Sequence, residues 1–451
     1  MKTTRNTYRF GPRILLLWLL MGGSLLLGTS CADHDPLPTV PDYRADVAVS
    51  WLNLQLRLVQ TTFVDPTNTF GRPFAYAGIA GYEAAVPGLL GYRTLEGQLN
   101  GLTGLPSTDK KLAYNSPLST NAALAAINRS FFSTTSAANL AAIDSLEATN
   151  KAACAAGLPP EVVERSVTFG KQVAASVWAW AQTDGYNNPA VYTLPTGPGL
   201  WVPTPPTFGK PVFPFWGSNR PIVASSIDNT DPGPPMAYSE QVGSPFYLMV
   251  KEVYDISQTS TAEQKATALF WNDVPNGRSF TPPGHWMSIL AQVLQKEHTS
   301  LGKALMAYAK VGITLNDALI STLKTKYTYN LLRPITYIRN TMGQPTWNSL
   351  IPTPSYPEYS AGHAVVSGSA AEALTQLFGD NYAFTDQNYV QFGLGSRSYA
   401  SFEQAGIEGG ISRLYGGIHY RVSCEKGQVQ GKTVARNINA KLFFKEVPLG
   451  K

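Results

Sequence analysis

The segment KYTYNLLRP, residues 326–334, carries a lysine and an arginine on a stretch whose pattern predicts a helix. Apolar residues recur at helical spacing from Ile313 through Ile338, so we expect one continuous helix there. Lys326 and Arg333 are seven residues apart, and two helical turns would bring both side chains to the same face. By themselves, two such cations are typical of a solvated helix surface. Their interpretation therefore depends on the neighbouring segments.

The segment YPEYSAGHA, residues 356–364, predicts the N-terminus of a helix. Ser360 is a suitable N-cap for a helix of small residues that runs to Phe378, with Gly362 and His363 in its first turn. The first turn of a helix offers unpaired backbone N–H groups and the positive end of the helix dipole. An oxyanion held by the neighbouring cations would therefore also meet the amide of Gly362.

The segment SRLYGGIHY, residues 412–420, adds another arginine and another histidine. Gly416 and Gly417 allow the chain to bend between Arg413 and His419, so that both side chains can point into one cavity. The whole chain has only five histidines. We interpret the occurrence of all three segments, in this order, as one anion-binding site.

Together the three segments resemble the vanadium-dependent haloperoxidases and the related type 2 phosphatidic acid phosphatases, which share one anion site. The PEY before the glycine–histidine pair, and the tract SRLYGGIHY, resemble the haloperoxidase branch more than the phosphatases. FWNDVPNGRSFTPPGHW, residues 270–286, is similar to segments of bacterial members of that branch. The resemblance covers the chain from about Asp46 onward and implies an all-α fold, a large helical domain of paired four-helix bundles.

The resemblance also implies a vanadate cofactor and a role for each residue of the three segments. His419 would be the axial ligand to vanadium, because neutral imidazole is a good metal ligand. His363 would hydrogen-bond the opposite axial oxygen and act as acid and base, and Gly362 would donate its backbone N–H. Arginine forks match the paired oxygens of an oxyanion. The cations that would neutralise the equatorial oxygens are Lys326, Arg333 and Arg413.

The activity implied by the resemblance is the oxidation of a halide by hydrogen peroxide, with vanadium acting as a Lewis acid at constant oxidation state. Lys326 would assist by drawing charge from the peroxide oxygen. The product would be a hypohalous species, available to an organic acceptor. With phosphate in the same pocket, His419 would instead be a nucleophile and His363 would protonate the leaving alcohol, which is the acid phosphatase alternative.

Two positions depart from the family pattern. Serine usually precedes the glycine–histidine pair, but Ala361 stands here, and one lost hydroxyl donor costs about 1–3 kcal/mol. The neighbouring Ser360 should point elsewhere. Ser423 stands where an aspartate commonly orients the axial histidine, and such partners change metal affinity or activity roughly ten- to hundredfold. A catalytically weak lipoprotein that binds an oxyanion is therefore a third alternative.

Further pocket positions bear on specificity. Tyr356 corresponds to a position that is aromatic in chloroperoxidase-like members and histidine in some bromoperoxidases. Chloride oxidation needs the strongest polarisation of peroxide, so a site short of a serine and an aspartate favours iodide or bromide. Asp273, in WNDVP, is a candidate partner of Arg413 or His419, or else a turn residue. His285, after Pro-Pro-Gly, is expected to be structural.

The N-terminus predicts export. Four basic residues precede the apolar run Ile14–Leu27, and the chain then reads LGTSC, ending at Cys31. The cysteine resembles a bacterial lipobox, so residues 1–30 would be a removed signal peptide, Cys31 the lipid anchor and residues 31–44 a tether. About fourteen apolar residues are short for an uncleaved membrane span. We therefore expect a membrane-anchored lipoprotein, periplasmic or at the cell surface.

Residues 45–451 are expected to form one haloperoxidase-like helical domain, since 44% of the chain is apolar and can fill a core. Charged residues make up 14%, and the net charge of +5 is dispersed, which argues against nucleic acid as a partner. Residues 187–236 are rich in proline and aromatic residues, and we interpret them as an ordered excursion around the bundle. Cys154 and Cys424 can pair in an oxidising compartment, but we favour a buried, unpaired Cys154.

Further helices are expected from alanine-rich apolar segments. These segments are Phe74–Leu90, Asn121–Ala156, Pro160–Ala181, Thr261–Trp271, Trp286–Ala309 and Val429–Phe444.

Overall fold

The computed structural model describes residues 43–62, 71–274 and 279–446, all within one compact unit. Most of these residues are helical, which confirms the predicted all-α class. The helices are α1 (Asp46–Thr61), α2 (Gly71–Ala85), α3 (Ser116–Phe131), α4 (Ala137–Ala155), α5 (Pro160–Ala181), α6 (Pro245–Thr259), α7 (Ala262–Phe270), α8 (Pro282–Lys296), α9 (Leu301–Tyr329), α10 (Pro334–Asn340), α11 (Gly362–Phe378), α12 (Phe402–Tyr415) and α13 (Arg421–Lys441). Short 3₁₀ turns lie at Val86–Gly88, Trp216–Ser218 and Val390–Phe392. The strands β1 (Phe384–Asp386) and β2 (Arg397–Tyr399) form an antiparallel hairpin.

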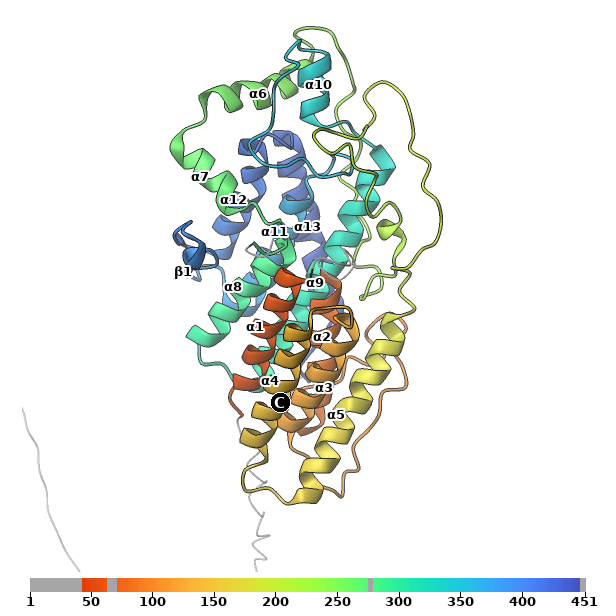
Figure 1. Ribbon diagram of the computed structural model, residues 1–451. Coiled ribbons are helices and arrows are strands. Elements are labelled where there is room, and N and C mark those ends of the chain that lie inside the picture. The colour runs from red at the N-terminus through yellow and green to blue at the C-terminus, as the bar shows by residue number, and fades with distance from the viewer. Residues whose placement is uncertain (1–42, 63–70, 275–278, 447–451) are drawn as a thin grey trace, which may run out of the picture. The chain divides into compact units, whose positions relative to one another are not determined.

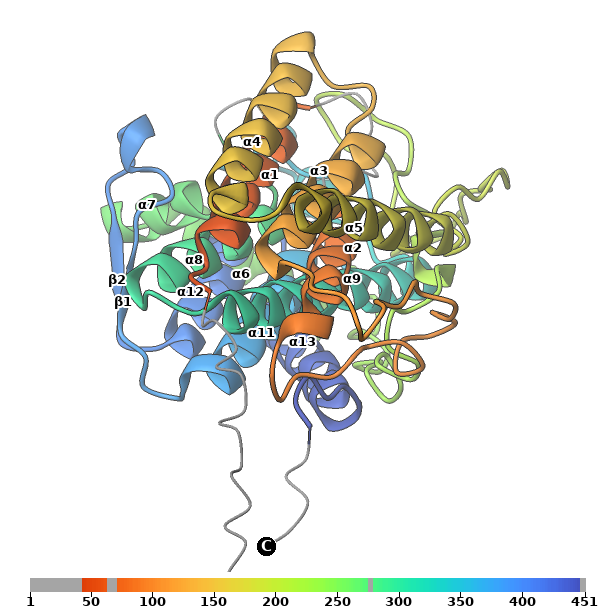
Figure 2. The ribbon, with the colours of Figure 1, turned by 90° about the horizontal axis from the view of Figure 1, so that it is seen from below.

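The helices form two groups that meet along α9 (Figure 1). In the first group α2 packs on α3 and α5, with α1 and α4 on α3, as the view along the bundle in Figure 2 shows. In the second group α11 packs on α12 and α13. Glycines permit close approach between helices: a Cβ on Gly78 would lie 2.7 Å from Cα of Ala309, and one on Gly431 would lie 2.0 Å from the carbonyl oxygen of Val365.

Three predicted helices are interrupted. The expected helix within 121–156 is two helices, because Ser136 accepts a hydrogen bond from the Asn139 amide and caps a new start. Ser300 does the same for α9, so the segment 286–309 also holds two helices. The helix expected through Ile338 ends at Tyr329, where Asn330 adopts the left-handed conformation and terminates α9.

The proline-rich excursion is held to α9 by a buried carboxylate. Asp317 accepts hydrogen bonds from the backbone amides of Ile222 and Val223 and from the Ser226 hydroxyl. Trp201, whose amide donates to the Asn330 carbonyl at 2.7 Å, is fully buried. These contacts fix the end of α9 and the residues that follow it.

The predicted signal peptide, Cys31 and residues 32–42 of the tether lie outside the described residues. Among the helices that the structure does describe, none is long and apolar enough to cross a bilayer. Cys154 and Cys424 are both free thiols, the first half-buried and the second buried.

Candidate active site

Arg333 reaches the predicted pocket from a loop, so the prediction that it shares a helix face with Lys326 is wrong. Asn330 ends α9 in the left-handed conformation, and Arg333, which is extended, precedes Pro334 and occupies the N-cap position of α10. The guanidinium is fully buried: Nε donates to the Tyr356 carbonyl at 2.9 Å and Nη1 to the Ile418 carbonyl at 2.9 Å. Within the described part of the chain its Nη2 has no hydrogen-bond partner. A buried donor without an acceptor is costly, and an oxyanion would satisfy it.

Lys326 lies on the last turn of α9 and is also buried. Its ammonium donates to the backbone carbonyls of Pro357, Glu358 and Ser360 at 3.0, 2.9 and 2.6 Å. It lies 4.9 Å from the ring centre of Tyr356, a cation–π contact. Burial, followed by the charge of Arg333, lowers the pKa of Lys326 well below its usual value.

His419 presents a lone pair to this cluster of cations. Its Nε2 lies 3.1 Å from Nη1 of Arg333, which can only donate, and its Nδ1 lies 2.8 Å from Oε1 of Glu358. Nδ1 therefore carries the proton, and Nε2 is the basic nitrogen. Burial and the charges of Arg333, Lys326 and Arg413 lower the pKa of His419 well below its usual value, so the imidazole is neutral.

Glu358, the acidic residue of the PEY motif, is the partner of His419, a contact that the motif did not predict. Its Oε1 also accepts the Tyr420 amide at 3.0 Å, and its Oε2 accepts the Ser423 hydroxyl at 2.7 Å. Burial raises the pKa of Glu358, and the charge of Lys326 and these donors partly offset that rise. The histidine is thus oriented by a carboxylate without an aspartate at position 423.

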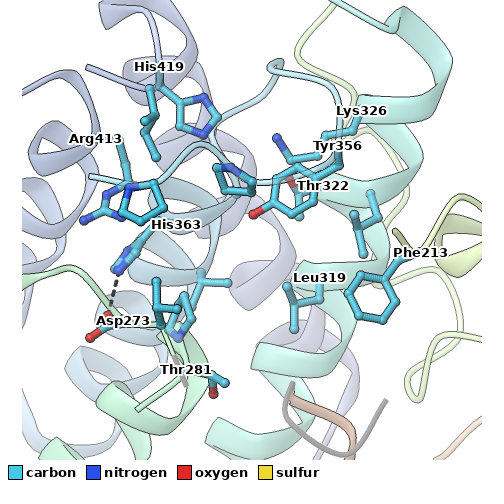
Figure 3. Close-up of a pocket in the computed structure, with 18 of the residues that line it drawn as sticks. Phe213, Asp273, Thr281, Leu319, Thr322, Lys326, Tyr356, His363, Arg413 and His419 are labelled. Atoms are coloured by element: carbon cyan, nitrogen blue, oxygen red, sulfur yellow. Dashed lines mark hydrogen bonds and ion pairs between the residues drawn. The ribbon is translucent and has the colours of Figure 1, made fainter. Parts of the chain in front are cut away.

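His363 lies in the first turn of α11 and is held at both nitrogens. Nε2 lies 2.7 Å from Oδ2 of Asp273, a contact drawn as a dashed line in Figure 3, and Nδ1 lies 3.2 Å from the Ser367 hydroxyl. Burial and the charge of Arg413 lower the pKa of His363, against the opposing effect of Asp273. The hydrogen bonds of Asp273 go to His363, His285 and Tyr389, and its predicted partnership with Arg413 is limited to its charge, which opposes the lowering of the Arg413 pKa by burial.

The start of α11 differs from the predicted cap. Ala361, not Ser360, is the N-cap residue, and its side chain cannot accept a hydrogen bond from the first turn. Ser360 instead donates to Oε1 of Gln430 at 2.6 Å, away from the first-turn amides. A Cβ added to Gly362 would lie 3.5 Å from Cε of Lys326, so this glycine faces the lysine stem.

Lys326, Gly362, His363, Arg413 and His419 line one cavity of about 200 Å³ (Figure 3), and Arg333 lies beside this lining, with Nη1 3.1 Å from Nε2 of His419. Arg413, at the end of α12, donates to the Trp271 carbonyl through Nη2 and to the Ser412 hydroxyl through Nε at 3.1 Å. Burial lowers the pKa of Arg413 to about 10. The lining also includes apolar residues and one carboxylate. The lining residues are Phe213, Asn272, Asp273, Val274, Thr281, Pro282, Leu319, Thr322, Leu323, Lys326, Pro352, Pro354, Tyr356, Gly362, His363, Val366, Arg413, Ile418 and His419.

Fold and pocket together define a helical-bundle protein with a buried, cation-lined pocket that contains two neutral histidines. The family model for the VCPO second helical-bundle domain matches residues 306–444. A bacterial vanadium-dependent iodoperoxidase of known structure is 34% identical, with a TM-score of 0.81 over 90% of this chain and 98% of its own. The chain belongs to the vanadium-dependent haloperoxidase family.

Two further structures share the fold at lower identity. A holo-type bacterial vanadium-dependent chloroperoxidase is 15% identical, with a TM-score of 0.57 over 90% of this chain and 95% of its own. An apo-type bacterial chloroperoxidase is 16% identical, with a TM-score of 0.60 over 90% of this chain and 96% of its own. No curated protein sequence matches the chain.

Proposed function

We propose that this protein is a vanadate-dependent haloperoxidase that uses hydrogen peroxide to oxidise iodide or bromide. The observation that carries the proposal is the lone pair at Nε2 of His419, held beside a buried arginine whose Nη2 has no acceptor among the residues that the structure describes. A neutral imidazole nitrogen suits a metal, and the free guanidinium donor suits an oxygen bound to that metal.

The residues present fit vanadate. His419 would ligate vanadium through Nε2, and Lys326, Arg333 and Arg413 would balance the charge of its oxygens. Gly362 would contribute an N–H from the uncapped first turn of α11. When bound, vanadate supplies a Lewis-acid centre that makes hydrogen peroxide electrophilic toward a halide.

The role of His363 follows from its tautomer. Asp273 accepts from Nε2, so the lone pair is at Nδ1, and Nδ1 is the nitrogen that would take a proton from peroxide. Only the Ser367 hydroxyl, at 3.2 Å, would have to give way. Asp273 would stabilise the imidazolium that results, as the carboxylate of a catalytic triad does. A vanadate oxygen that accepted a contact from His363 would take the place of the Ser367 hydroxyl at Nδ1, while Nε2 would stay bonded to Asp273.

The proposed halides rest on two features. Ala361 supplies no hydroxyl donor, so one neutral contribution to peroxide polarisation is missing. The similar protein at 34% identity is an iodoperoxidase. Both favour the more easily oxidised halides over chloride.

Acid phosphatase activity is the alternative, because the lone pair of His419 amid cations would also suit attack on a phosphate ester. The third alternative, a weak oxyanion-binding protein, was based on Ala361 and on Ser423, and the second of these reasons no longer supports it. Glu358 orients His419 in the absence of an aspartate at position 423.

The test uses purified enzyme incubated with orthovanadate and freed from the excess, assayed with hydrogen peroxide and iodide, bromide or chloride. Turnover that requires vanadate, and that is lost in His419→Ala but kept in His298→Asn, supports the proposal. His298 is an exposed histidine outside the pocket with a left-handed backbone that asparagine tolerates. Vanadate-inhibited hydrolysis of a phosphate ester without halide oxidation would instead support the phosphatase.

We also propose that the protein is exported and anchored through a lipid on Cys31. The basic residues, the short apolar run and the LGTSC sequence support this. Mass spectrometry of the protein isolated from bacterial membranes tests it. An N-terminal cysteine carrying acyl chains is expected, with release into the soluble fraction on Cys31→Ala. An unprocessed N-terminus in membranes would contradict the proposal.

A further inference from the structure

A buried row of acidic and histidine side chains extends from the pocket away from the cations. His285, on α8, lies between two carboxylates: Nδ1 is 2.8 Å from Oδ1 of Asp273 and Nε2 is 2.7 Å from Oδ2 of Asp386. All three side chains are fully buried. The imidazole also stacks on Trp271 at 4.3 Å between ring centres, which fixes its plane.

This geometry sets the charge of His285. A neutral imidazole has one N–H, so two short contacts to carboxylates require both ring nitrogens to carry protons. Burial lowers the pKa of His285, but Asp273 and Asp386 outweigh it and raise the pKa to about 10. The imidazolium lowers the pKa of Asp273 in turn, against the effect of burial.

The far end of the row is anchored by the hairpin. Asp386 is the last residue of β1, and its Oδ1 accepts the Asn388 amide at 2.9 Å. The Asn388 side chain donates to the His285 carbonyl at 3.1 Å. The hairpin therefore holds Asp386 against α8, and the sequence gives no spacing signal for this long-range contact.

The near end reaches the proposed proton acceptor. Oδ1 of Asp273 is occupied by His285 and the Tyr389 hydroxyl, which leaves Oδ2 for Nε2 of His363 at 2.7 Å. The charged groups that act on His363 are Asp273 from the loop after α7, Arg413 from α12 and, beyond Asp273, His285 from α8. His419 is neutral, as described above.

We propose that His285 and Asp386 are positioning residues for the peroxidase reaction: through Asp273 they fix the orientation of His363 and set the negative charge beside it. This inference rests on the proposed function, since His363 must be the proton acceptor. In the native row two carboxylates and one imidazolium leave one net negative charge. That negative charge favours the tautomer of His363 with a proton on Nε2. The positive charge of Arg413 opposes it, so Nδ1 of His363 stays unprotonated.

Substitutions at His285 and Asp386 should shift the pKa of His363 in opposite directions, although both substitutions disrupt the same His285–Asp386 hydrogen bond. His285→Asn removes a cation and leaves two carboxylates near His363, so His363 should be protonated at higher pH. Asp386→Asn keeps nearly the same shape and removes one anion, so His363 should be protonated only at lower pH. A purely structural role would lower stability in both variants without this opposition.

The experiment compares the full-length enzyme with both variants, and with Asp317→Asn as a matched control. Asp317 is an equally buried carboxylate that accepts hydrogen bonds from the excursion and lies outside the row. NMR of ¹³C-labelled histidine, without vanadate, gives the titration of His363, with its resonance assigned by comparison with His363→Gln. The acid limb of iodide oxidation with vanadate gives the kinetic counterpart.

We expect His285→Asn to move the His363 midpoint and the acid limb upward by about one pH unit, and Asp386→Asn to move both downward. Asp317→Asn should move neither. Shifts in the same direction, or no shift with only a lower melting temperature, overturn the proposal. If His285→Asn does not fold, Asp386→Asn decides alone, and anything but a downward shift overturns it. The NMR titration does not require turnover. An inactive native enzyme would therefore refute the proposed function, while the shifts of the His363 midpoint would still test the positioning role of His285 and Asp386.

Discussion

Replacing Ser423 by aspartate, the residue that the resemblance to the family implies at this position, should harm this protein. The Ser423 hydroxyl donates to Oε2 of Glu358 at 2.7 Å, and both residues are buried. A second carboxylate at this place would face Glu358, and two carboxylates that share a buried site cannot both stay ionised. One must take a proton at neutral pH. For a carboxyl with an unfolded pKa of about 3.9, that costs about 4 kcal/mol at pH 7.

The pH dependence of the loss distinguishes this cause from poor packing. The folded-state pKa of the shared carboxyl is raised above its unfolded value, so the cost is absent below about pH 4 and grows by about 1.4 kcal/mol per pH unit above it. Urea unfolding of Ser423→Asp and Ser423→Ala from pH 4 to 8 measures it. A Ser423→Asp variant as stable as native at pH 7, or a loss independent of pH, would refute the reasoning.

A double variant provides the rescue. In Glu358→Gln/Ser423→Asp the amide oxygen can keep the place of Oε1, where the His419 ring and the Tyr420 amide both donate. The amide NH₂ can then donate to the new carboxylate. We expect most of the lost stability to return at pH 7, and vanadate binding to return with it. A double variant less stable than Ser423→Asp would contradict the assigned hydrogen-bond directions.

Three further substitutions have defined outcomes. Gly362→Ala places a methyl group 3.5 Å from Cε of Lys326, an ordinary contact, so the melting temperature should hold while vanadate affinity, measured by equilibrium dialysis, falls about tenfold. Burial lowers the pKa of Lys310 to about 8, below its unfolded value of 10.5, so Lys310→Met should stabilise the protein at pH 7 by about 1–3 kcal/mol in urea unfolding. That gain in stability should shrink as pH rises from 8 to 10.5. The side chain of Asn439 would lose its hydrogen bond from the Lys310 ammonium, but Asn439 is exposed and can bond water instead. Ala361→Ser adds an N-cap hydroxyl to α11 and should raise both stability, by about 1 kcal/mol in thermal unfolding, and affinity for vanadate in dialysis.

Local sequence signals were sufficient for the helix that carries His363, except for its N-cap, and they identified Lys326, Gly362, His363, Arg413 and His419, which line one cavity. Gly416 and Gly417 do allow the chain to return, with Gly417 at a φ of +78° and His419 two residues later. The signal failed at Asn330, because an apolar pattern that continues through Ile338 conceals a break made by one residue in the left-handed conformation. Arg333 therefore reaches the pocket from a loop and not from a helix face.

The carboxylates of the site could not be assigned from spacing. Glu358 lies 61 residues from His419 in the chain, and Asp386 lies 101 residues from His285, so only packing brings each pair together. The one available signal was the presence of an acidic residue in a motif whose other residues are expected to be buried. A buried carboxylate needs hydrogen-bond or charged partners, so such a residue is expected to contact polar groups of the site. That reasoning would have pointed to Glu358 and to Asp273, but not to which histidine each one contacts.

The contacts of these two carboxylates explain how one pocket can give two histidines different tasks. Glu358 binds His419 at Nδ1 and so turns the Nε2 lone pair toward the cations, as a metal ligand requires. Asp273 binds His363 at Nε2 and so leaves the lone pair at Nδ1. The rings therefore have opposite tautomers, although burial and nearby cations lower the pKa of both. The position of each acidic partner, more than the histidines themselves, separates the proposed ligand from the proposed base.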